Sequence, residues 1–351
     1  MVIDSHLDLA LNSVIWNRDL TKSVTEIRQI ETGMTDHKFR AKGTVAFPEM
    51  HKGELFLCLG TVFARLADGA IASSSPEIAY ASAQGQLAYY RILEAQGSLR
   101  IIRDLTALEI HMEEWSQSTQ QGAPLGIILA NEGGDAIFSP DQVESWWNDG
   151  LRVSGLAHYG VSKYAHGTGT SGGLTSLGRE LLESMYSRGM ILDVSHLSDE
   201  SFWEALDIFK GPIIASHNNC RALVPGDRQL SDDQLRALIH RHAVIGIAAD
   251  AWMLYPGWVK GATSSTLVNM KDMVNHIHHV CQLAGNTRNA GLGTDLDGGY
   301  GKEQCPHDLD TIADLQKIPN LLEKRGYSSE DVKRIMHVNW FRFFHDAWSK
   351  L

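Results

Sequence analysis

Short apolar runs bounded by turn residues recur along the chain and alternate with longer amphipathic segments. Segments such as 76–96, 174–189, 199–211 and 230–243 carry a helical pattern. Because strands that alternate with helices form parallel sheets, and eight such units close on themselves, the pattern predicts an α/β fold, a (β/α)8 TIM barrel. The eight apolar runs cover residues 2–9, 55–63, 125–133, 151–159, 190–196, 212–218, 243–250 and 290–298.

The rest of the chain offers no point at which to divide this barrel. We find no repeat, linker or low-complexity tract, and 351 residues with 43% hydrophobic content can bury one large core. We therefore expect a single domain over residues 1–351. Residues 64–76, ARLADGAIASSSP, are small and polar, which predicts a surface loop.

Polar residues interrupt the first apolar run, which reads VIDSHLDL. Since side chains alternate along a strand, Asp4, His6 and Asp8 should share one face, and Ile3, Ser5, Leu7 and Leu9 should pack on helices from the other. His6 and Asp8 would then project into the barrel mouth, where enzymes of this fold keep their chemistry. Later runs also end in ionisable side chains, namely Glu132, His158, His196, His217 and Asp295.

Imidazoles and carboxylates that converge on one mouth suit a divalent transition metal. The four cysteines are far apart and form no C-x-x-C motif, so a thiolate site is not expected. Nitrogen and oxygen donors favour zinc. A pair of ions needs a shared ligand, and the two oxygens of a carboxylate allow Glu132 to bridge them.

Several motifs, taken together and in order, resemble one known family. DSHLDL, NEGGDAI, GLAHY, GMILDVSH, IIASHNNCRAL with DRQLSD, and GLGTDLDG are similar to motifs of the membrane (renal) dipeptidase family, peptidase family M19 of the amidohydrolase superfamily. MHVNWFRFF near the C-terminus resembles a further motif, so the similarity covers nearly the whole chain. The family commonly has EGGH and THN where this chain has EGGD and AHY, which places Asp135 and Tyr159 as residues that could line the pocket.

The resemblance implies a barrel with two zinc ions and zinc-dependent hydrolysis of dipeptides by a hydroxide held between the ions. Substrates would include dipeptides with a D-residue at the C-terminal position, which the family tolerates. By motif position, the ligands would be His6 and Asp8 for one ion, His196 and His217 for the other, and Glu132 for both. Asp295 would transfer the proton, His158 would stabilise the tetrahedral intermediate, and Arg228, with Tyr159 nearby, would bind the substrate carboxylate.

Other interpretations remain open at this point. A binuclear site could cleave another small amide or an N-acyl amino acid, or a metal could be bound without catalysis. GTGTSG at 167–172 fits the glycine spacing of a dinucleotide-binding oxidoreductase, but GVSKYAH separates it from the preceding strand, so we interpret it as an active-site loop. Asp297 could replace Asp295 as the acid, and Arg228 could form a surface salt bridge, with Arg221 close by. The histidines of HIHH at 276–279 and HRH at 240–242 are expected to pack or face solvent.

Charge and the chain ends bear on partners and location. With 31 basic and 42 acidic residues the net charge is −11, which argues against a nucleic-acid or anionic-membrane surface. Neither end shows a signal-type or lipid-anchor pattern, so we expect a cytoplasmic enzyme. Its expected partner is a small-molecule dipeptide substrate. The resembling family allows a homodimer, although no feature of this sequence demands one.

Overall fold

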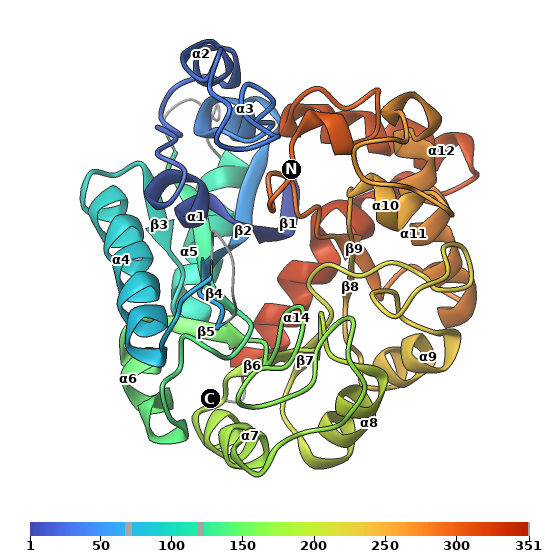
Figure 1. The fold of residues 1–351 in the computed structure, drawn as a ribbon. Coiled ribbons are helices and arrows are strands. Elements are labelled where there is room, and N and C mark those ends of the chain that lie inside the picture. The colour runs from blue at the N-terminus through green and yellow to red at the C-terminus, as the bar shows by residue number, and fades with distance from the viewer. Residues whose placement is uncertain (67–71, 118–122, 350–351) are drawn as a thin grey trace.

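A computed structural model describes residues 1–66, 72–117 and 123–349, and Figure 1 shows a ring of strands surrounded by helices. The strands are β1 Val2–Leu7, β2 Leu55–Phe63, β3 Leu99–Ile101, β4 Leu125–Glu132, β5 Leu151–Ser154, β6 Ile191–Asp193, β7 Ile213–Ile214, β8 Ile245–Ile247 and β9 Ala290–Leu292. The α-helices are α1 Leu9–Val14, α2 Val24–Ile30, α3 Phe47–Lys52, α4 Pro76–Ala95, α5 Leu105–Gln117, α6 Val143–Asn148, α7 Ser176–Arg188, α8 Asp199–Ile208, α9 Asp232–His240, α10 Ala251–Leu254, α11 Met270–Ala284, α12 Ile318–Lys324, α13 Ser329–Lys333 and α14 Asn339–Trp348.

The strands form a parallel sheet that closes on itself. Their order is β7-β6-β5-β4-β2-β1-β9-β8, and a parallel bridge between Ala215 and Ile245 joins the two ends. Gly246 N–H donates to Ala215 O at 2.8 Å across this seam. The predicted (β/α)8 barrel is confirmed. Part of the predicted surface loop at 64–76 lies outside the described residues.

One strand was not predicted, and most of the others are shorter than the apolar runs. β3 pairs with the first half of β4 outside the barrel path. Its three residues, LRI, are too few to show a periodic pattern. β6 to β9 have only two or three residues each, so the polar residues at the ends of their apolar runs lie in the loops that follow. Side chains in these loops are free of strand alternation and can turn toward the barrel axis.

Polar N-caps explain why several predicted helices start where they do. Ser75, Thr175, Ser198 and Ser231 precede α4, α7, α8 and α9, and each side-chain oxygen accepts a hydrogen bond from a backbone N–H of the first turn. Such caps satisfy N–H groups that have no partner within the helix. The four helices lie on the outer side of the barrel (Figure 1).

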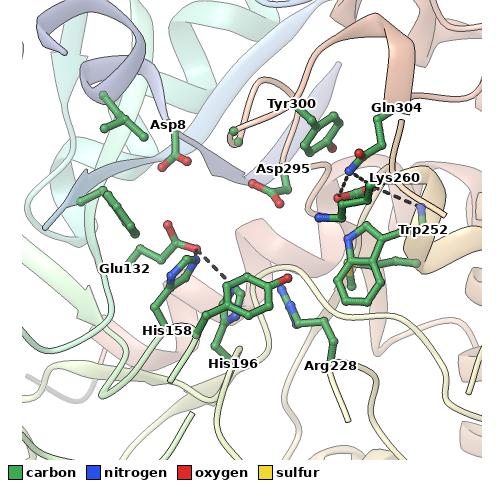
Figure 2. A pocket seen from close by; sticks show the side chains of 17 residues that line it. Asp8, Glu132, His158, His196, Arg228, Trp252, Lys260, Asp295, Tyr300 and Gln304 are labelled. Carbon is green, nitrogen blue, oxygen red and sulfur yellow. Dashed lines mark hydrogen bonds and ion pairs between the residues drawn. The ribbon is translucent and has the colours of Figure 1, made fainter. Parts of the chain in front are cut away.

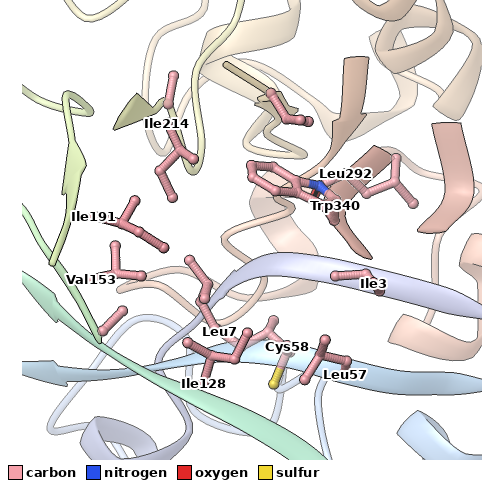
Figure 3. Packing of buried hydrophobic residues seen from close by; sticks show 14 of the residues in the cluster. Ile3, Leu7, Leu57, Cys58, Ile128, Val153, Ile191, Ile214, Leu292 and Trp340 are labelled. Atoms are coloured by element: carbon pink, nitrogen blue, oxygen red, sulfur yellow. Dashed lines mark hydrogen bonds between the residues drawn. The ribbon is translucent and has the colours of Figure 1, made fainter. Parts of the chain in front are cut away.

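Branched and aromatic side chains fill the base of the barrel (Figure 3). Trp340, on α14, is fully buried, and its Nε1 donates to Leu292 O on β9 at 3.0 Å. A Cβ at Gly291 would lie 2.3 Å from Trp340 Nε1, so glycine is needed there for the helix to approach β9. Asn339 Nδ2 donates to Thr287 O and Ala290 O, at the start of β9. The C-terminal motif therefore holds α14 at the end of the barrel where the strands begin.

The predicted alternation of side chains in β1 is wrong after Asp4. The pairing with β2 shifts by one residue between Asp4 and Leu7. Ser5, expected on the helix side, donates from Oγ to Ser216 O across the barrel at 2.6 Å and to Leu292 O at 2.9 Å. Asp4, expected on the same face as His6, accepts from Thr294 N–H and Thr294 Oγ1, just after β9. A bulge inserts one residue and re-aims the side chains around it, and it leaves His6 facing inward.

Candidate metal centre

The predicted metal ligands, together with His158 and Asp295, reach one end of the barrel from different strands or from the loops that follow them. Glu132 is the last residue of β4, His6 lies within β1, and Asp8 follows β1 at the N-cap position of α1. The others lie three or four residues beyond the ends of β5, β6, β7 and β9, and they are His158, His196, His217 and Asp295. This is the carboxyl end of the strands, as the sequence analysis expected.

Four imidazoles surround one oxygen of Glu132. The Nε2 atoms of His6, His158, His196 and His217 lie 3.6, 3.6, 3.3 and 3.4 Å from Glu132 Oε1. His196 Nε2 lies 3.0 Å from His217 Nε2. His6 Nε2 is buried and has no hydrogen-bond partner among the described residues. Nitrogen lone pairs that meet at this spacing are arranged as metal ligands are.

The cluster divides into groups that could each hold an ion. His6, Asp8 and Glu132 form one, and Glu132, His196 and His217 form another. In each, the ligand atoms lie within 4.8 Å of one another, and the two groups share only Glu132. His6, His217 and Asp295 make a third combination. The first two groups are the ligand sets that motif position implied.

Two aspartates brace the histidines from behind. Asp193 Oδ1 accepts from Ser195 N–H and Ser216 N–H, and its Oδ2 accepts from Ser216 Oγ at 2.5 Å. Ser216 Oγ lies 2.7 Å from His217 Nδ1. On the other side of the barrel, Asp4 Oδ1 accepts from the backbone N–H of His6 and of a residue after β9. The Asp193–Ser216 pair orients the His217 ring and sets which ring nitrogen is free, whereas Asp4 fixes the backbone at His6.

Residues of the glycine-rich segment also support the cluster. Thr168 Oγ1 lies 3.2 Å from His196 Nδ1 and donates to His196 O at 3.2 Å. Thr61 Oγ1, on β2, hydrogen-bonds to Asp8 Oδ1. Thr168 thus contacts a predicted metal ligand, in agreement with the interpretation of 167–172 as an active-site loop, and the parallel barrel is not the fold of the dinucleotide-binding alternative. Sequence reasoning missed Thr61, Thr168 and Ser216, because a hydroxyl one layer behind a ligand has no motif of its own.

Backbone strain is concentrated in the same loops. His196 has φ +67° and Asp295 has φ +57°, in the left-handed region that residues other than glycine rarely adopt. Such conformations persist where surrounding hydrogen bonds hold them, and they are often found at functional sites. Here they turn the two side chains toward Glu132.

Burial and the charges of neighbouring side chains set the pKa values of the clustered histidines and carboxylates. Burial opposes ionisation of Glu132, but the neighbouring histidines, His158 and His6 above all, outweigh it and hold the pKa of Glu132 well below its usual range. Burial alone would lower the pKa of His6, yet Glu132, Asp8 and Asp295 raise it to about 10. Burial lowers the pKa of His196 and His217 well below the usual value. Neutral imidazole is the form that ligates metals.

The remaining carboxylates are too crowded to ionise together easily. Burial and then Glu132 raise the pKa of Asp8 to about 7, and burial raises that of Asp295 well above its usual range. Buried carboxylates need a cation or a proton. The free Nε2 of His6, the neutral imidazoles and this unbalanced negative charge together fit divalent ions held between Glu132 and its neighbours.

A cavity of about 90 Å³ opens beside the cluster. Figure 2 shows Asp295, Glu132, His158 and His196 around it, with Arg228 on the far side. Arg228 is 2% exposed, its Nη2 donates to His217 O at 2.8 Å, and its buried Nη1 has no partner among the described residues. Tyr159 lies edge-on to His158 and His196 with ring centroids 4.8 and 5.0 Å apart. An unpaired guanidinium beside the cavity can bind an anion.

A family model for the membrane dipeptidases, peptidase family M19, matches residues 1–349. The chain belongs to this family. An uncharacterised protein from the pqqA 5′ region of Klebsiella pneumoniae is 30% identical over 76% of this chain and 96% of its own length. The dipeptidase aclJ of Aspergillus oryzae is 25% identical over 98% of this chain and 77% of its own, and the dipeptidase tcpJ of Claviceps purpurea is 31% identical over 56% and 45%.

Solved structures of M19 peptidases share the fold. A metallo peptidase from Rhodobacter sphaeroides, liganded with a phosphinate mimic of L-Ala-D-Ala, superposes with a TM-score of 0.79 at 21% identity and covers 99% of both chains. The dipeptidase AC gives 0.80 at 20% identity over 99% and 98%. The predicted family and the class of enzyme are confirmed. No helix in the described part of this M19 chain is both long and apolar enough to cross a membrane.

The alternative assignments within the M19 site can now be judged by contacts. Asp297 accepts from Thr44 N–H, Thr44 Oγ1 and Val45 N–H and lies 3.5 Å from Arg18, so it is held away from the cavity. Arg221 pairs with Asp199 at 2.7 Å, whereas no acidic side chain in the described ranges pairs with Arg228. The HIHH histidines bond to other groups: His276 accepts from Cys220 N–H, His278 contacts Tyr327 and His279 contacts Asp232.

Sequence reasoning overlooked the wall of the cavity opposite the metal ligands. Asp250, the last residue of the run AVIGIAAD, accepts from Gln304 Nε2 at 2.8 and 2.9 Å. Trp252 and Lys260 follow it, with Lys260 Nζ 4.9 Å from the Trp252 ring (Figure 2). The sequence did carry a signal for Asp250. It ends the apolar run 243–250, and each of the other runs between 125 and 298 had supplied a predicted site residue. Gln304 had no signal, since it comes from the loop after β9.

Proposed function

We propose that this protein is a zinc-dependent dipeptidase that cleaves L,L and L,D dipeptides with a free C-terminal carboxylate. One observation carries the proposal: an unpaired, buried Arg228 shares a small cavity with the cluster around Glu132. The relatives named dipeptidases and the phosphinate dipeptide mimic bound to the Rhodobacter protein support the same substrate class.

Two divalent ions fit the donor set, with Glu132 as the shared ligand. His6 and Asp8 would complete one position, and His196 and His217 the other. Bound there, the ions would act as Lewis acids toward the peptide carbonyl and bring the pKa of water toward neutrality. Asp193 and Ser216 would keep His217 in the ring orientation and tautomer that ligation requires.

His158 is suited to stabilise the negative oxygen of the tetrahedral intermediate. Burial lowers the pKa of His158 to about 4, so its ring is neutral and carries one N–H. Its Nε2 is 3.6 Å from Glu132 Oε1, longer than a hydrogen bond, and its Nδ1 has no partner among the described residues. A donor that is fixed in place but unpaired can be used in the transition state.

Asp295 is suited to move the proton from the attacking water to the leaving amine. Its side chain points into the cavity across from His158 (Figure 2), and Oδ1 lies 3.8 Å from His6 Nε2. A general acid–base group must reach both the water and the amine. Arg228 would hold the substrate carboxylate with its unpaired N–H groups, so the peptide's C-terminal residue would lie between Arg228 and Asp295.

The test combines metal content by mass spectrometry with hydrolysis of L,L and L,D dipeptides followed by ninhydrin. We expect about two zinc ions per chain and cleavage that chelation abolishes. Arg228→Gln should raise KM for free dipeptides and leave C-terminally amidated ones unchanged, whereas Arg221→Gln, a surface control, should change neither. Cleavage of N-acyl amino acids but not dipeptides would favour the alternative amide substrate and overturn the proposal. The single domain, the cytoplasmic location and the homodimer stay predictions.

A further inference from the structure

A second and larger cavity, of about 720 Å³, lies at the opposite end of the barrel. Residues just ahead of β6, β7, β8 and β9 line it together with α14, so it opens where the strands begin. The metal ligands lie where the strands end. We name it the basal pocket, and its charged lining consists of Lys210, Arg241, His242, Arg288, Arg342 and Asp346.

The charge of the basal pocket is opposite in sign to the net charge of the chain. The chain carries 42 acidic and 31 basic residues, yet this lining has four permanent cations and one carboxylate. No ion pair within 4.0 Å joins Lys210, Arg241, Arg288 or Arg342 to an acid in the described part of the chain. Asp346 instead lies 3.7 Å from His345. Four cations against one carboxylate in one concave surface create a positive potential that attracts anions.

Backbone carbonyls hold two of the guanidinium groups in place without neutralising them. Arg241 Nη2 donates to Phe209 O and Gly211 O, both at 2.9 Å. Arg342 Nη2 donates to Arg288 O at 2.8 Å, while its Nε is buried and has no acceptor among the described residues. Arginine donors positioned in this way pay little entropy to bind phosphate or carboxylate oxygens.

We propose that the basal pocket binds a small anion that carries two or more phosphate or carboxylate groups. The volume is within the range of small-molecule sites, and the cations come from α14 and from three separate loops, an arrangement that suits more than one anionic group. Because this pocket and the metal centre lie at opposite ends of the barrel, the proposal does not depend on the proposed hydrolysis.

The test is isothermal titration calorimetry of the full chain at low ionic strength. Fructose 1,6-bisphosphate probes for phosphates, tricarballylate probes for carboxylates, and uncharged fructose serves as the blank. We expect one of the two anions to bind with a stoichiometry of one. The double variant Arg288→Gln with Arg342→Gln should weaken this binding at least tenfold, and the exposed single variant Arg288→Gln several-fold. Arg236→Gln, which removes an exposed cation from α9 outside the pocket, should stay within twofold of the unaltered protein.

Three results would overturn the proposal. In the first, neither anion binds at millimolar concentration. In the second, the double variant, verified as folded by its thermal transition, binds as tightly as the unaltered protein. In the third, Glu132→Gln abolishes binding while the double variant does not, which would locate the anion at the metal centre. The preferred probe tells a phosphate ligand from a carboxylate ligand.

Discussion

The two ends of the barrel both gather ionisable side chains, but they differ in the sign of the charge and in depth. At the carboxyl end, Glu132, Asp8 and His6 are 8, 5 and 2% exposed, and His6 Nε2 lies 3.6 Å from Glu132 Oε1 and 3.9 Å from Asp8 Oδ1. At the other end, Lys210 and Arg288 are exposed, and Arg241 and Arg342 are half-buried. Buried charges interact strongly and require a partner, whereas salt screens exposed ones. The comparison predicts large effects at the carboxyl end and small ones at the base.

The largest effect should follow Glu132→Gln. The substitution removes the negative charge that four imidazole Nε2 atoms face, and it aims an amide group at them. Metal affinity should fall more than about 100-fold, beyond the loss typical of outer partners, and hydrolysis should become undetectable. Metal content and turnover measure both. Glu330→Gln, on the surface, is the control, and retained activity in Glu132→Gln would contradict the assignment.

Asp295→Asn and Asp297→Asn form a matched pair that separates chemistry from stability. Asp295→Asn should lower kcat about 10²–10⁴-fold with metal content unchanged, because the proton carrier is lost. Asp297→Asn should leave kcat nearly intact. It should lower the free energy of unfolding by about 1–3 kcal/mol, since it weakens buried bonds to Thr44 and Val45. Equal kcat losses in the two variants would remove the proton role from Asp295.

Metal removal should lower the stability of the fold, because the predicted ions bind at the carboxyl end of the barrel. At an ion concentration about 100 times Kd, bound metal stabilises by about 2.7 kcal/mol per site. Chelation should therefore lower Tm by several degrees, and Glu132→Gln should show little further change on chelation. Differential scanning calorimetry with and without chelator tests this. An unchanged Tm in the unaltered protein would mean that bound metal is not needed to balance the charge of the buried carboxylates.

His111, on α5, sharpens the comparison, because it is buried and lines neither the cavity at the metal centre nor the basal pocket, and no ion pair joins it to an acid among the described residues. Its Nε2 lies 2.7 Å from Phe56 O, and burial lowers its pKa to about 4. The unfolded chain takes up the proton first, so this contribution is full above pH 6.5 and is lost as pH falls toward 4. Relative to His111→Gln, the unaltered protein should lose about 2 kcal/mol between pH 7 and pH 5.

Urea unfolding at the two pH values measures this difference between the proteins. His345→Gln, at a surface histidine, is the control and should follow the unaltered protein. If His111→Gln loses as much stability as the unaltered protein over this interval, His111 makes no such contribution.

The smallest effect should come from the base. Arg288→Gln relieves repulsion with its neighbour Arg342 and should raise stability by a few tenths of a kcal/mol at low salt. The gain should vanish in 0.5 M salt, because the side chain is exposed and screened. Chemical denaturation at both salt concentrations tests this, and a gain that survives high salt would show that the charges interact through the protein interior.

Prediction from sequence was most successful where one local signal decided the structure. Apolar runs located all eight strands of the barrel path closely enough to order them, and strand-end residues such as Glu132 and His217 did converge. It failed where one residue of register mattered. The register shift between Asp4 and Leu7 accompanies a Ser5 side chain that reaches across the barrel instead of packing on helices, because pairing with β2 is not visible in β1 alone.

The order of strands and helices, the family and the imidazole and carboxylate groups available to a metal could be inferred from the chain alone, because they depend on the local pattern and on motif order. Three features became visible only in the folded protein: Ser216 and Asp193 orient His217, Arg228 Nη1 has no partner among the described residues, and cations from four separate segments meet at the base. Such relations join residues far apart in the chain, and closure of the barrel is the physical event that brings them within bonding distance.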